Sequence, residues 1–153
     1  MARRSAGILL HRGGPEGREV LLVHPGGPFW AKRDAGAWSI PKGEYDEGEE
    51  PLAAALREFE EEVGSALDAA GELVALGDVR QKNRKLVTAW AAEGDVDASA
   101  VRSNTFAMEW PPRSGQTQEF PEIDRAEWFP LARAREKLIE AQVAFLDRLE
   151  EAG

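Results

Sequence analysis

Acidic side chains are concentrated in the stretch GEYDEGEEPLAAALREFEEEVGS, which begins at Gly43. Within it, Glu61 and Glu62 follow Glu58 by three and four residues. In an α-helix these intervals place the side chains on one side. Neighbouring carboxylates repel one another, and clustered hard oxygen donors suit Mg²⁺ or Mn²⁺ better than metals that prefer imidazole or thiolate. The spacing therefore predicts a divalent-cation site on a helix.

A helix from about Pro51 to Val63 must carry these side chains. Proline suits the first helical turn, where its missing N–H is not needed, and Gly64 is a typical stop. The apolar residues recur at helical spacing and are Leu52, Ala55, Leu56, Phe59 and Val63. They should face the core and leave the glutamates at its rim, where Arg57 can pair with Glu61. A solvated acidic face is the usual reason for such a charge run, so the wider pattern has to decide.

The remaining elements predict an α/β fold. Strand-like segments are rich in β-branched or aromatic residues and end at turn residues. They are Ser5–Leu10, Val20–Val23, Trp38–Ile40, Leu73–Val79, Lys85–Ala91, Thr105–Trp110 and Ala126–Phe129. RGGPEGRE indicates a hairpin turn, HPGGPFWAKRDAGA a long loop, VDASAVRSN a short helix or a loop, and Pro130 to Leu149 a second long helix. Strands mixed with helices favour a mixed sheet packed between helices.

The composition limits the function. A chain of 153 residues suits one domain, and the absence of cysteine excludes disulfides and thiolate metal sites. A net charge of −9 disfavours generic binding to nucleic acid or anionic membranes, so a polyanionic substrate would need metal cations to mediate the contact. No stretch is long enough to span a membrane, and the first apolar run is too short for a signal sequence. We expect a cytoplasmic protein.

The acidic stretch resembles the Nudix box: Gly, five residues, Glu, seven residues, then Arg-Glu-hydrophobic-any-Glu-Glu-any-Gly-hydrophobic. The matching residues are Gly43, Glu49, Arg57, Glu58, Phe59, Glu61, Glu62 and Gly64, and only Ser65 departs, at the last hydrophobic position. The preceding WSIPKGE is similar to the strand that leads into the box in this family. The resemblance implies one Nudix domain over residues 1–153, with its box at 43–65, and an α/β/α sandwich around a mixed sheet.

The resemblance also implies a reaction and its metal ligands. Nudix enzymes use divalent cations, here Mg²⁺ with Mn²⁺ as a substitute, to hydrolyse a phosphoanhydride bond in a nucleoside diphosphate linked to another group. By position, Glu58, Glu61 and Glu62 would bind the metal together with the carbonyl oxygen of Gly43. Glu58 is also a candidate for the base that orients water. Arg57 would be structural and would pair with a box carboxylate.

Other expected contacts lie around the box. Glu49 would order the loop or pair with Arg57. Many relatives use one acidic residue outside the box, and here Glu119 and Glu122 are the best candidates, with a solvated loop carboxylate as the alternative for each. The same stretch also offers Asp124 and Glu127, but these two adjoin the predicted strand EWF, so Glu119 and Glu122 are preferred.

Substrate contacts are expected from basic and aromatic residues. Lys42 could meet a phosphate as a point charge, and Lys82 and Lys85 belong to the basic turn RQKNRK. Trp30, with Phe29 as a competitor, could stack on a base. The alternatives are ordinary surface charges and an aromatic residue that covers the edge of the core.

The predicted substrate is a small nucleotide, with nucleoside triphosphates and dinucleoside polyphosphates favoured. WSIPKGE looks most similar to members that act on dinucleoside polyphosphates, and related members act on diphosphoinositol polyphosphates or RNA 5′ ends. Nucleic acid is otherwise an unlikely partner for so acidic a chain. The alternative is a non-catalytic, nucleotide-binding regulatory module, although the retention of all box glutamates argues against it. The sequence leaves the oligomeric state open.

Overall fold

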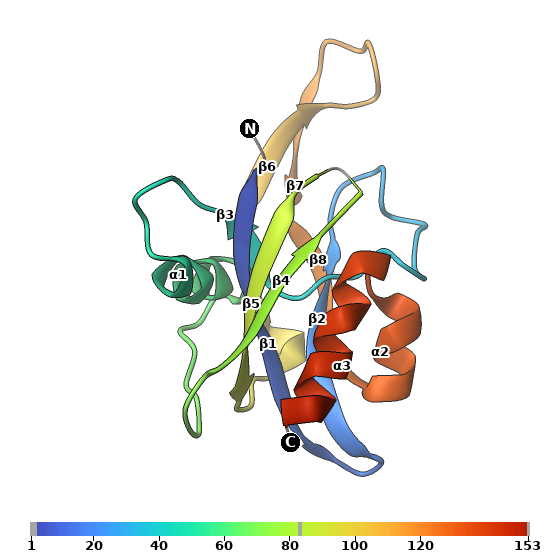
Figure 1. Cartoon of the computed structure of the whole chain (residues 1–153). Coiled ribbons are helices and arrows are strands. Elements are labelled where there is room, and N and C mark those ends of the chain that lie inside the picture. Colours follow the sequence, from blue (N-terminus) through green and yellow to red (C-terminus); the bar gives the residue numbers. More distant parts are fainter. Residues whose placement is uncertain (1–2, 83, 153) are drawn as a thin grey trace.

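The computed structural model describes residues 3–82 and 84–152 (Figure 1). Its centre is a six-stranded mixed sheet in the order β4-β5-β1-β2-β8, with β3 also paired to β1. The strands are β1 (Arg4–Gly14), β2 (Gly17–Pro25), β3 (Lys42–Glu44), β4 (Val74–Arg80), β5 (Leu86–Glu93) and β8 (Ile123–Pro130). Only the β1–β5 pair is parallel. The predicted hairpin turn joins β1 to β2, and the segments predicted around β1, β2, β4, β5 and β8 are confirmed as strands.

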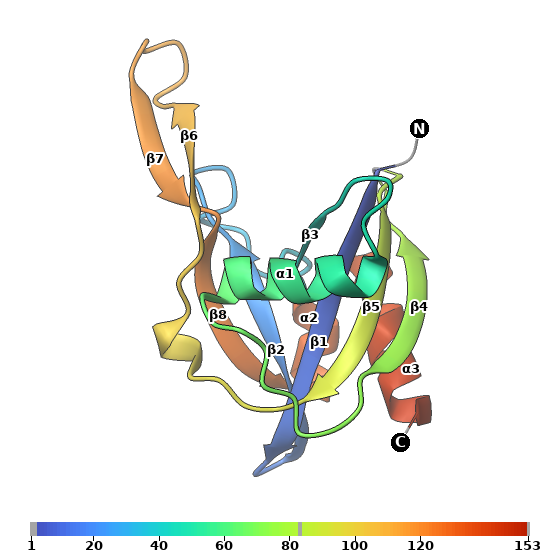
Figure 2. The same cartoon turned by 90° about the vertical axis from the view of Figure 1, so that its left-hand side faces the viewer.

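Helices cover both faces of this sheet, which confirms the predicted α/β/α sandwich (Figures 1 and 2). Helix α1 (Pro51–Val63) lies on one face, and α2 (Leu131–Lys137) and α3 (Val143–Ala152) lie on the other. Side chains alternate along β1, so Ile8 belongs to the core under α1 and Leu9 to the core under α2 and α3. Among the described residues, no helix is long and apolar enough to cross a membrane.

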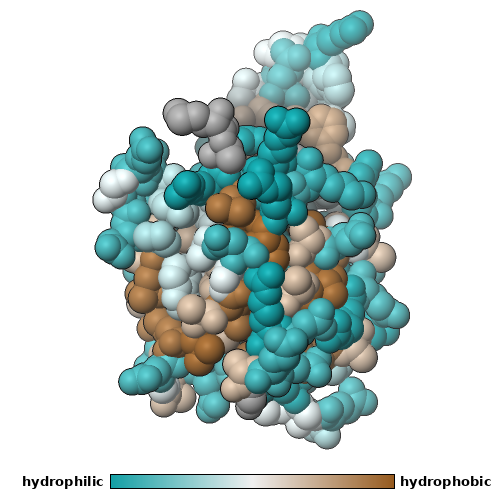
Figure 3. Space-filling view, in the orientation of Figure 1, coloured by the Kyte–Doolittle hydropathy of each residue, from teal (hydrophilic) through white to brown (hydrophobic). Residues whose placement is uncertain are grey.

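A separate two-stranded hairpin projects from the body of the molecule (Figure 2). It consists of β6 (Thr105–Glu109) and β7 (Thr117–Pro121). Figure 3 shows that its far end carries mostly hydrophilic residues. The first strand was predicted from its β-branched and aromatic residues, but the second was not, because TQEFP is polar and short. The segment VDASAVRSN, which the sequence left undecided, contains a 3₁₀ helix, η1 (Ala98–Ala100).

The segment 38–44 lies between β1 and β2, is called the wedge below, and positions the start of the acidic stretch. The two strands pair only near their shared turn, from His11 opposite Val20 to the tip. Beyond this point they diverge, and the segment 38–44 fills the gap. Ser39 exchanges two backbone hydrogen bonds with Val23, of 2.8 and 3.0 Å, and the Ile8 amide donates to the Pro41 carbonyl at 3.1 Å. Because β3 continues this segment along β1, the chain reaches α1 from a fixed position.

Two predictions about this region were wrong for one shared reason. The segment Pro130–Leu149 is not one helix: it is interrupted at Leu138, whose backbone is extended, and continues through the 3₁₀ helix η2 (Glu140–Gln142) before α3. Trp38 forms an isolated bridge to Leu138 instead of a strand of the sheet. Its amide donates to the Lys137 carbonyl at 2.9 Å, and its carbonyl accepts from the Ile139 amide at 2.8 Å. These long-range bonds outweigh the helical preference of the segment.

A buried glutamine completes the support of the wedge. Gln142 is fully buried, and its side-chain oxygen accepts a hydrogen bond from the Ile40 amide at 3.0 Å. Its side-chain nitrogen donates to Ser39 Oγ at 3.1 Å and to Gln81 Oε1 at 3.0 Å. Since a buried amide must satisfy all of its polar atoms, this network ties η2 firmly to the segment that enters β3.

Candidate active site

Helix α1 begins and ends as its sequence predicts. Pro51 occupies its first turn, and Gly64 ends it with a left-handed backbone at φ 91°. A side chain at position 64 would also come within 2.6 Å of the Arg102 carbonyl oxygen. The helix buries Ala55, Phe59 and Val63, together with Ala54, against the sheet. Its acidic residues are therefore held at the edge of a well-packed face.

The first glycine of the stretch leaves room for a carboxylate. A Cβ atom at Gly43 would lie 1.9 Å from Oε2 of Glu58, so only glycine fits beneath this side chain. Gly43 pairs with Ala6 of β1, and this pairing fixes the position of Gly43 relative to α1. The Glu58 side chain is only 13% exposed. Burial raises the pKa of this carboxyl group, while its hydrogen bond to Arg57 opposes the rise.

Arg57 links the loop before the helix to the helix itself. Its Nε and Nη2 atoms donate to the two carboxylate oxygens of Glu49 at 2.9 and 3.0 Å. Its Nη1 atom donates to Glu58 at 2.6 Å and lies 3.5 Å from Glu61. The bonds from Arg57 lower the pKa of Glu49, which accordingly stays ionised. This two-pronged contact orients the loop and one carboxylate of the cluster.

Glu62 is the most strongly perturbed of these groups. It accepts a hydrogen bond from the Lys42 amide at 2.9 Å. Burial raises the pKa of Glu62 to about 8, and the negative charges of Glu58 and Glu122 add to the effect. The hydrogen bond and the positive charge of Lys42 oppose this rise without cancelling it. A cation held by this carboxylate would reverse the cost of ionising it.

The structure distinguishes the two acidic candidates outside the box. Glu122 follows β7, and its backbone is fixed by the amide of Gly26 and the carbonyl of Asn104 at 2.8 and 2.9 Å. Burial and the charge of Glu61 raise the pKa of Glu122, and its own charge raises the pKa of two box carboxylates. Glu119 is exposed on the projecting hairpin, in the strand β7. The geometry thus brings Glu122 to the cluster.

Lys42 lies on the other face of the sheet from Glu58. A Cβ atom at Gly7 would come within 2.7 Å of Lys42 Cβ and 3.0 Å of Ile40, which belongs to the core under α2 and α3. Burial lowers the pKa of Lys42, and the nearby charge of Lys85 lowers it further. Among the described residues, no carboxylate forms an ion pair with the Lys42 ammonium group at close range. Ser5 Oγ, on the neighbouring strand β1, is buried without a hydrogen-bond partner.

The other substrate candidates are separated by the fold. The Lys85 side chain is 15% exposed, and its Nζ atom lies 3.5 Å from Oε2 of Glu44, which is the last residue of β3. Lys82 is 94% exposed, and its ion pair at 3.8 Å is with Glu140 on the side of η2. Trp30 lies on the exposed loop after β2, with its ring partly covered by Arg33. Proximity to the box thus favours Lys42 and Lys85 over Lys82.

The donor chemistry fits a hard divalent cation. Glu58, Glu61, Glu62 and Glu122 supply only carboxylate oxygens, and burial together with mutual repulsion raises the pKa of three of them. In the present arrangement, no three acidic or histidine side chains of the described residues converge into a ready-made cage, because Arg57 and the Lys42 amide engage two of these carboxylates. When a cation binds, these two hydrogen bonds must therefore break, or the carboxylates must contact the cation and their present donors together.

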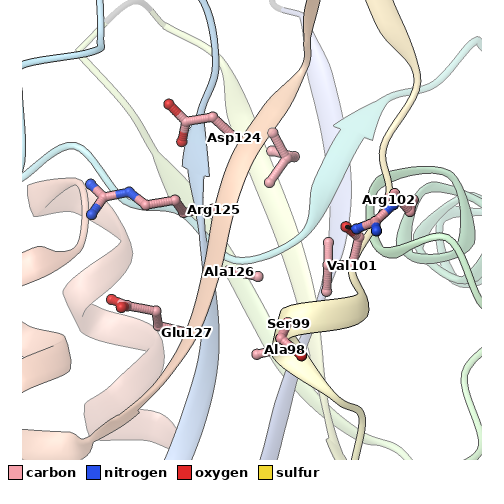
Figure 4. Close-up of a pocket in the computed structure, with 9 residues that line it drawn as sticks. Ala98, Ser99, Val101, Arg102, Asp124, Arg125, Ala126 and Glu127 are labelled. Atoms are coloured by element: carbon pink, nitrogen blue, oxygen red, sulfur yellow. Dashed lines mark hydrogen bonds between the residues drawn. The ribbon is translucent and has the colours of Figure 1, made fainter.

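A shallow cavity that the sequence did not predict begins next to Glu122. Its volume is about 250 Å³, and it lies between η1 and the first half of β8. Figure 4 shows Ala98 and Val101 on one side of β8 and Arg125 and Glu127 pointing to the other side. No local pattern reveals this cavity, because its walls are brought together from separate segments, 98–102 and 123–127.

Comparison with known proteins identifies the family. The sequence matches the NUDIX domain over residues 1–149. The chain belongs to the Nudix family. The assignment to the Nudix pyrophosphohydrolases is thereby confirmed, and divalent metals such as Mg²⁺ are general in this family.

Two curated Nudix relatives are RNA pyrophosphohydrolases. The Brucella anthropi protein is 34% identical over 146 residues, which cover 78% of each chain. The Agrobacterium fabrum protein is 29% identical over 157 residues, which cover 85% of each chain.

Solved structures support the Nudix fold. A Caenorhabditis elegans Ap4A hydrolase aligns with a TM-score of 0.64 at 21% identity, over 99% of this chain and 97% of that one. The Nudix domain of Shewanella oneidensis NrtR, complexed with ADP ribose, aligns with a TM-score of 0.65 at 15% identity, over 99% and 88%.

Proposed function

We propose that this Nudix protein hydrolyses a phosphoanhydride bond at the 5′ end of a nucleotide substrate, with Mg²⁺ bound by Glu58, Glu61 and Glu62. The observation that carries the proposal is the group of carboxylates at the edge of α1, joined by Glu122 from the junction between β7 and β8. Such a group is costly without cations, and phosphate oxygens are the natural further ligands of the same cations. Mn²⁺ is the expected substitute.

The reaction requires positioning more than covalent help from the protein. Water attacks a phosphorus atom, the bond from that phosphorus to the bridging oxygen breaks, the bridging oxygen leaves on the other phosphate, and one proton is released. The bound cation supplies charge neutralisation and acidifies water. The assignment of Glu58 as the residue that orients the attacking water is supported by its fixed position: Arg57 donates to one of its oxygens, and the carboxylate packs closely against Gly43.

Two residues extend the proposed site toward the substrate. The carbonyl oxygen of Gly43 adds a neutral ligand at the base of the cluster. The Lys42 side chain leaves the strand on the face opposite Glu58, but its desolvated positive charge still acts on Glu62, Glu44 and Glu58, which supports Lys42 as a candidate contact for a phosphate group. Lys85, beside it, would add a second positive charge.

The named relatives direct the choice of substrate. Because curated relatives of comparable length are RNA pyrophosphohydrolases, an RNA 5′ triphosphate is the first substrate to test. The small substrates favoured by the sequence, nucleoside triphosphates and dinucleoside polyphosphates, stay in the comparison. All of them present the same chemistry, a chain of phosphates attached to a 5′ carbon. A cytoplasmic location stays a prediction.

The test is turnover with a matched pair of variants. The protein is incubated with Mg²⁺ and 5′-triphosphorylated RNA, nucleoside triphosphates or dinucleoside polyphosphates, and the released phosphates are separated by chromatography. Glu62→Gln should reduce kcat by at least about 1000-fold, because it removes a metal ligand. Glu60→Gln, an exposed neighbour on the same helix, is the control and should keep full activity. Equal activity of the two variants would contradict the proposed role of the cluster.

A further inference from the structure

An aromatic surface, formed by the exposed Phe29 and Trp30 and the half-buried Trp110, lies on the loop that is bonded through Gly26 to the backbone of Glu122. Phe29 and Trp30 are 65% and 40% exposed, on the loop that follows β2. The ring of Phe29 meets that of Trp110, at the tip side of the hairpin, edge to face at 5.8 Å between centroids. Exposed aromatic residues gathered from two distant segments indicate a surface that binds something.

Close backbone contacts fix this aromatic surface relative to the cluster. The Gly26 amide donates to the carbonyl oxygen of Glu122 at 2.8 Å. A Cβ atom at Gly26 would lie 1.9 Å from the Pro121 carbonyl oxygen, and one at Gly27 would lie 2.9 Å from the ring of Phe106. Glycine at both positions lets the loop lie directly against the base of the hairpin. The aromatic surface therefore starts within a few residues of a carboxylate of the proposed metal site.

The local charge of this region differs from that of the whole chain. The net charge of the protein is −9, but the exposed segment FWAKRD contains two cations and one acidic residue, Asp34, whose carboxylate is already engaged by Lys137 and by Trp38 Nε1. Lys32 shows no ion pair among the described residues, and the Arg33 guanidinium lies 5.6 Å from the centre of the Trp30 ring. The hairpin adds Arg113 at its tip, together with the carboxylates of Glu109 and Glu119 on its strands. Aromatic rings interleaved with cations are typical of surfaces that hold single-stranded nucleic acid, because bases stack and phosphates pair.

We propose that the aromatic surface binds the first nucleotides of a single-stranded RNA whose 5′ phosphates lie at the carboxylate cluster. The inference rests on the proposed function and adds a means by which the enzyme distinguishes an RNA end from a free nucleotide. Bases stack on Phe29 and Trp30, and Lys32 pairs with the backbone. A free nucleotide is too short to use all of these contacts, so the surface favours the longer substrate.

The first experiment compares substrates of increasing length. Unstructured RNA with a 5′ triphosphate is used, from a single nucleotide to about ten, and kcat/KM is measured for each. In the wild-type protein, kcat/KM should rise with length until the aromatic surface is filled. In the variant Phe29→Ala/Trp30→Ala, the ratio of kcat/KM for long RNA to that for one nucleotide should fall by at least about 10-fold, the usual loss for a stacked base.

A matched control separates stacking from general loss of apolar surface. Val74→Ala removes a side chain that is 44% exposed on β4, away from the hairpin, and it should leave the ratio unchanged. Thermal melting of each variant verifies that the fold is intact. A wild-type kcat/KM that does not rise with length, or a ratio that the double variant does not lower, would overturn the inference while leaving the proposed function standing.

A direct measurement of RNA binding tests the proposed aromatic surface even if no substrate is turned over. Fluorescence anisotropy of labelled RNA is measured with Glu62→Gln protein, with and without the aromatic substitutions and with Mg²⁺ present. Loss of binding by about 10-fold in the aromatic variant would support the surface. Binding that is absent, or equal with and without the rings, would overturn it and leave the surface to a protein partner.

The salt dependence provides an independent check on Lys32. Each lysine that pairs with a phosphate of single-stranded RNA contributes about 0.7 to the slope of log affinity against log salt concentration. Lys32→Gln should therefore reduce the slope by roughly this amount. The control Arg133→Gln, an exposed cation on α2, should leave the slope unchanged, and a slope that responds equally to both variants would contradict a specific path for the RNA.

Discussion

The carboxylate cluster and the aromatic surface are linked through the backbone bond between Gly26 and Glu122, yet they are built in opposite ways. The cluster is formed mainly by one helix and the turn before it, and its parts interlock: Gly43 leaves space for Glu58, and Arg57 joins the loop to the helix. The aromatic surface is formed by exposed side chains on a loop and a projecting hairpin. The comparison suggests that the reaction depends on a rigid centre, while the choice of substrate depends on exposed periphery that can vary without disturbing the fold.

Apart from the removal of a proposed metal ligand, the largest effect is expected where the centre has no free space. Gly43→Ala places a methyl group 1.9 Å from Glu58 Oε2, so the carboxylate must move away from its present position. We expect kcat to fall by at least about 100-fold with little change in secondary structure, because displacement of a catalytic group by about 1 Å has this order of effect. Measurement of kcat and of the far-UV circular dichroism spectrum checks both parts.

Gly13→Ala is the matched control for this substitution. A Cβ atom at Gly13 meets no other atom within 4 Å, and the position lies in β1 near the hairpin turn. It should keep wild-type activity. If Gly43→Ala also kept wild-type activity, the tight fit between position 43 and the helix would have no functional importance.

The difference between the two regions also explains which parts of the site the sequence could predict. Spacing along one helix fixes the relative directions of Glu58, Glu61 and Glu62, so short-range pattern was sufficient there. Glu122 joins them only because β8 begins with an irregular register next to Gly26, which no local signal reveals. The sequence therefore left two candidates, Glu119 and Glu122, for an acidic residue outside the box that joins the cluster. The fold was needed to favour Glu122.

The fold was predictable to a similar extent and for similar reasons. Strands with clear alternation and the helix with its cap signals were identified correctly. The wedge at Trp38, the break at Leu138 and the polar strand β7 were not, because each depends on hydrogen bonds to distant chain segments. The face on which Lys42 lies was equally hidden, since it follows from the pairing of β3 with β1.

A smaller effect is expected from Arg57→Lys. Lysine keeps the positive charge but cannot donate from two nitrogens to Glu49 while a third donates to Glu58. We expect kcat to fall by about 10-fold, the lower end of the range for residues that orient metal ligands. The affinity for Mg²⁺, obtained by titration of activity, should weaken in parallel. Wild-type values of both quantities would mean that charge alone suffices at this position.

Protonation of the cluster gives a prediction about stability and pH. Because the pKa of Glu62 rises from the ordinary 4.5 to about 8 on folding, the folded state binds more protons than the unfolded state between these values. The free energy of unfolding of the metal-free protein should therefore decrease as pH rises through this window. Denaturant titration at several pH values checks this decrease.

Two comparisons assign that pH dependence to the cluster. Glu62→Gln should flatten the decrease, whereas Glu60→Gln should preserve it. Added Mg²⁺ should also flatten it in the wild-type protein, because the cation stabilises the ionised carboxylates of the folded state only. A decrease of equal slope in all of these samples would place the titrating group elsewhere.

The smallest effect on stability is expected from the aromatic surface itself. Phe29→Ala removes a ring that is 65% exposed, so the free energy of unfolding should fall by less than about 1 kcal/mol. Phe59→Ala removes a fully buried ring beneath the carboxylate cluster and should cost about 3 to 5 kcal/mol. Denaturant unfolding of both variants measures this contrast. Comparable losses would mean that the loop and the hairpin belong to the cooperative core, and the division between a rigid centre and a tolerant periphery would then fail.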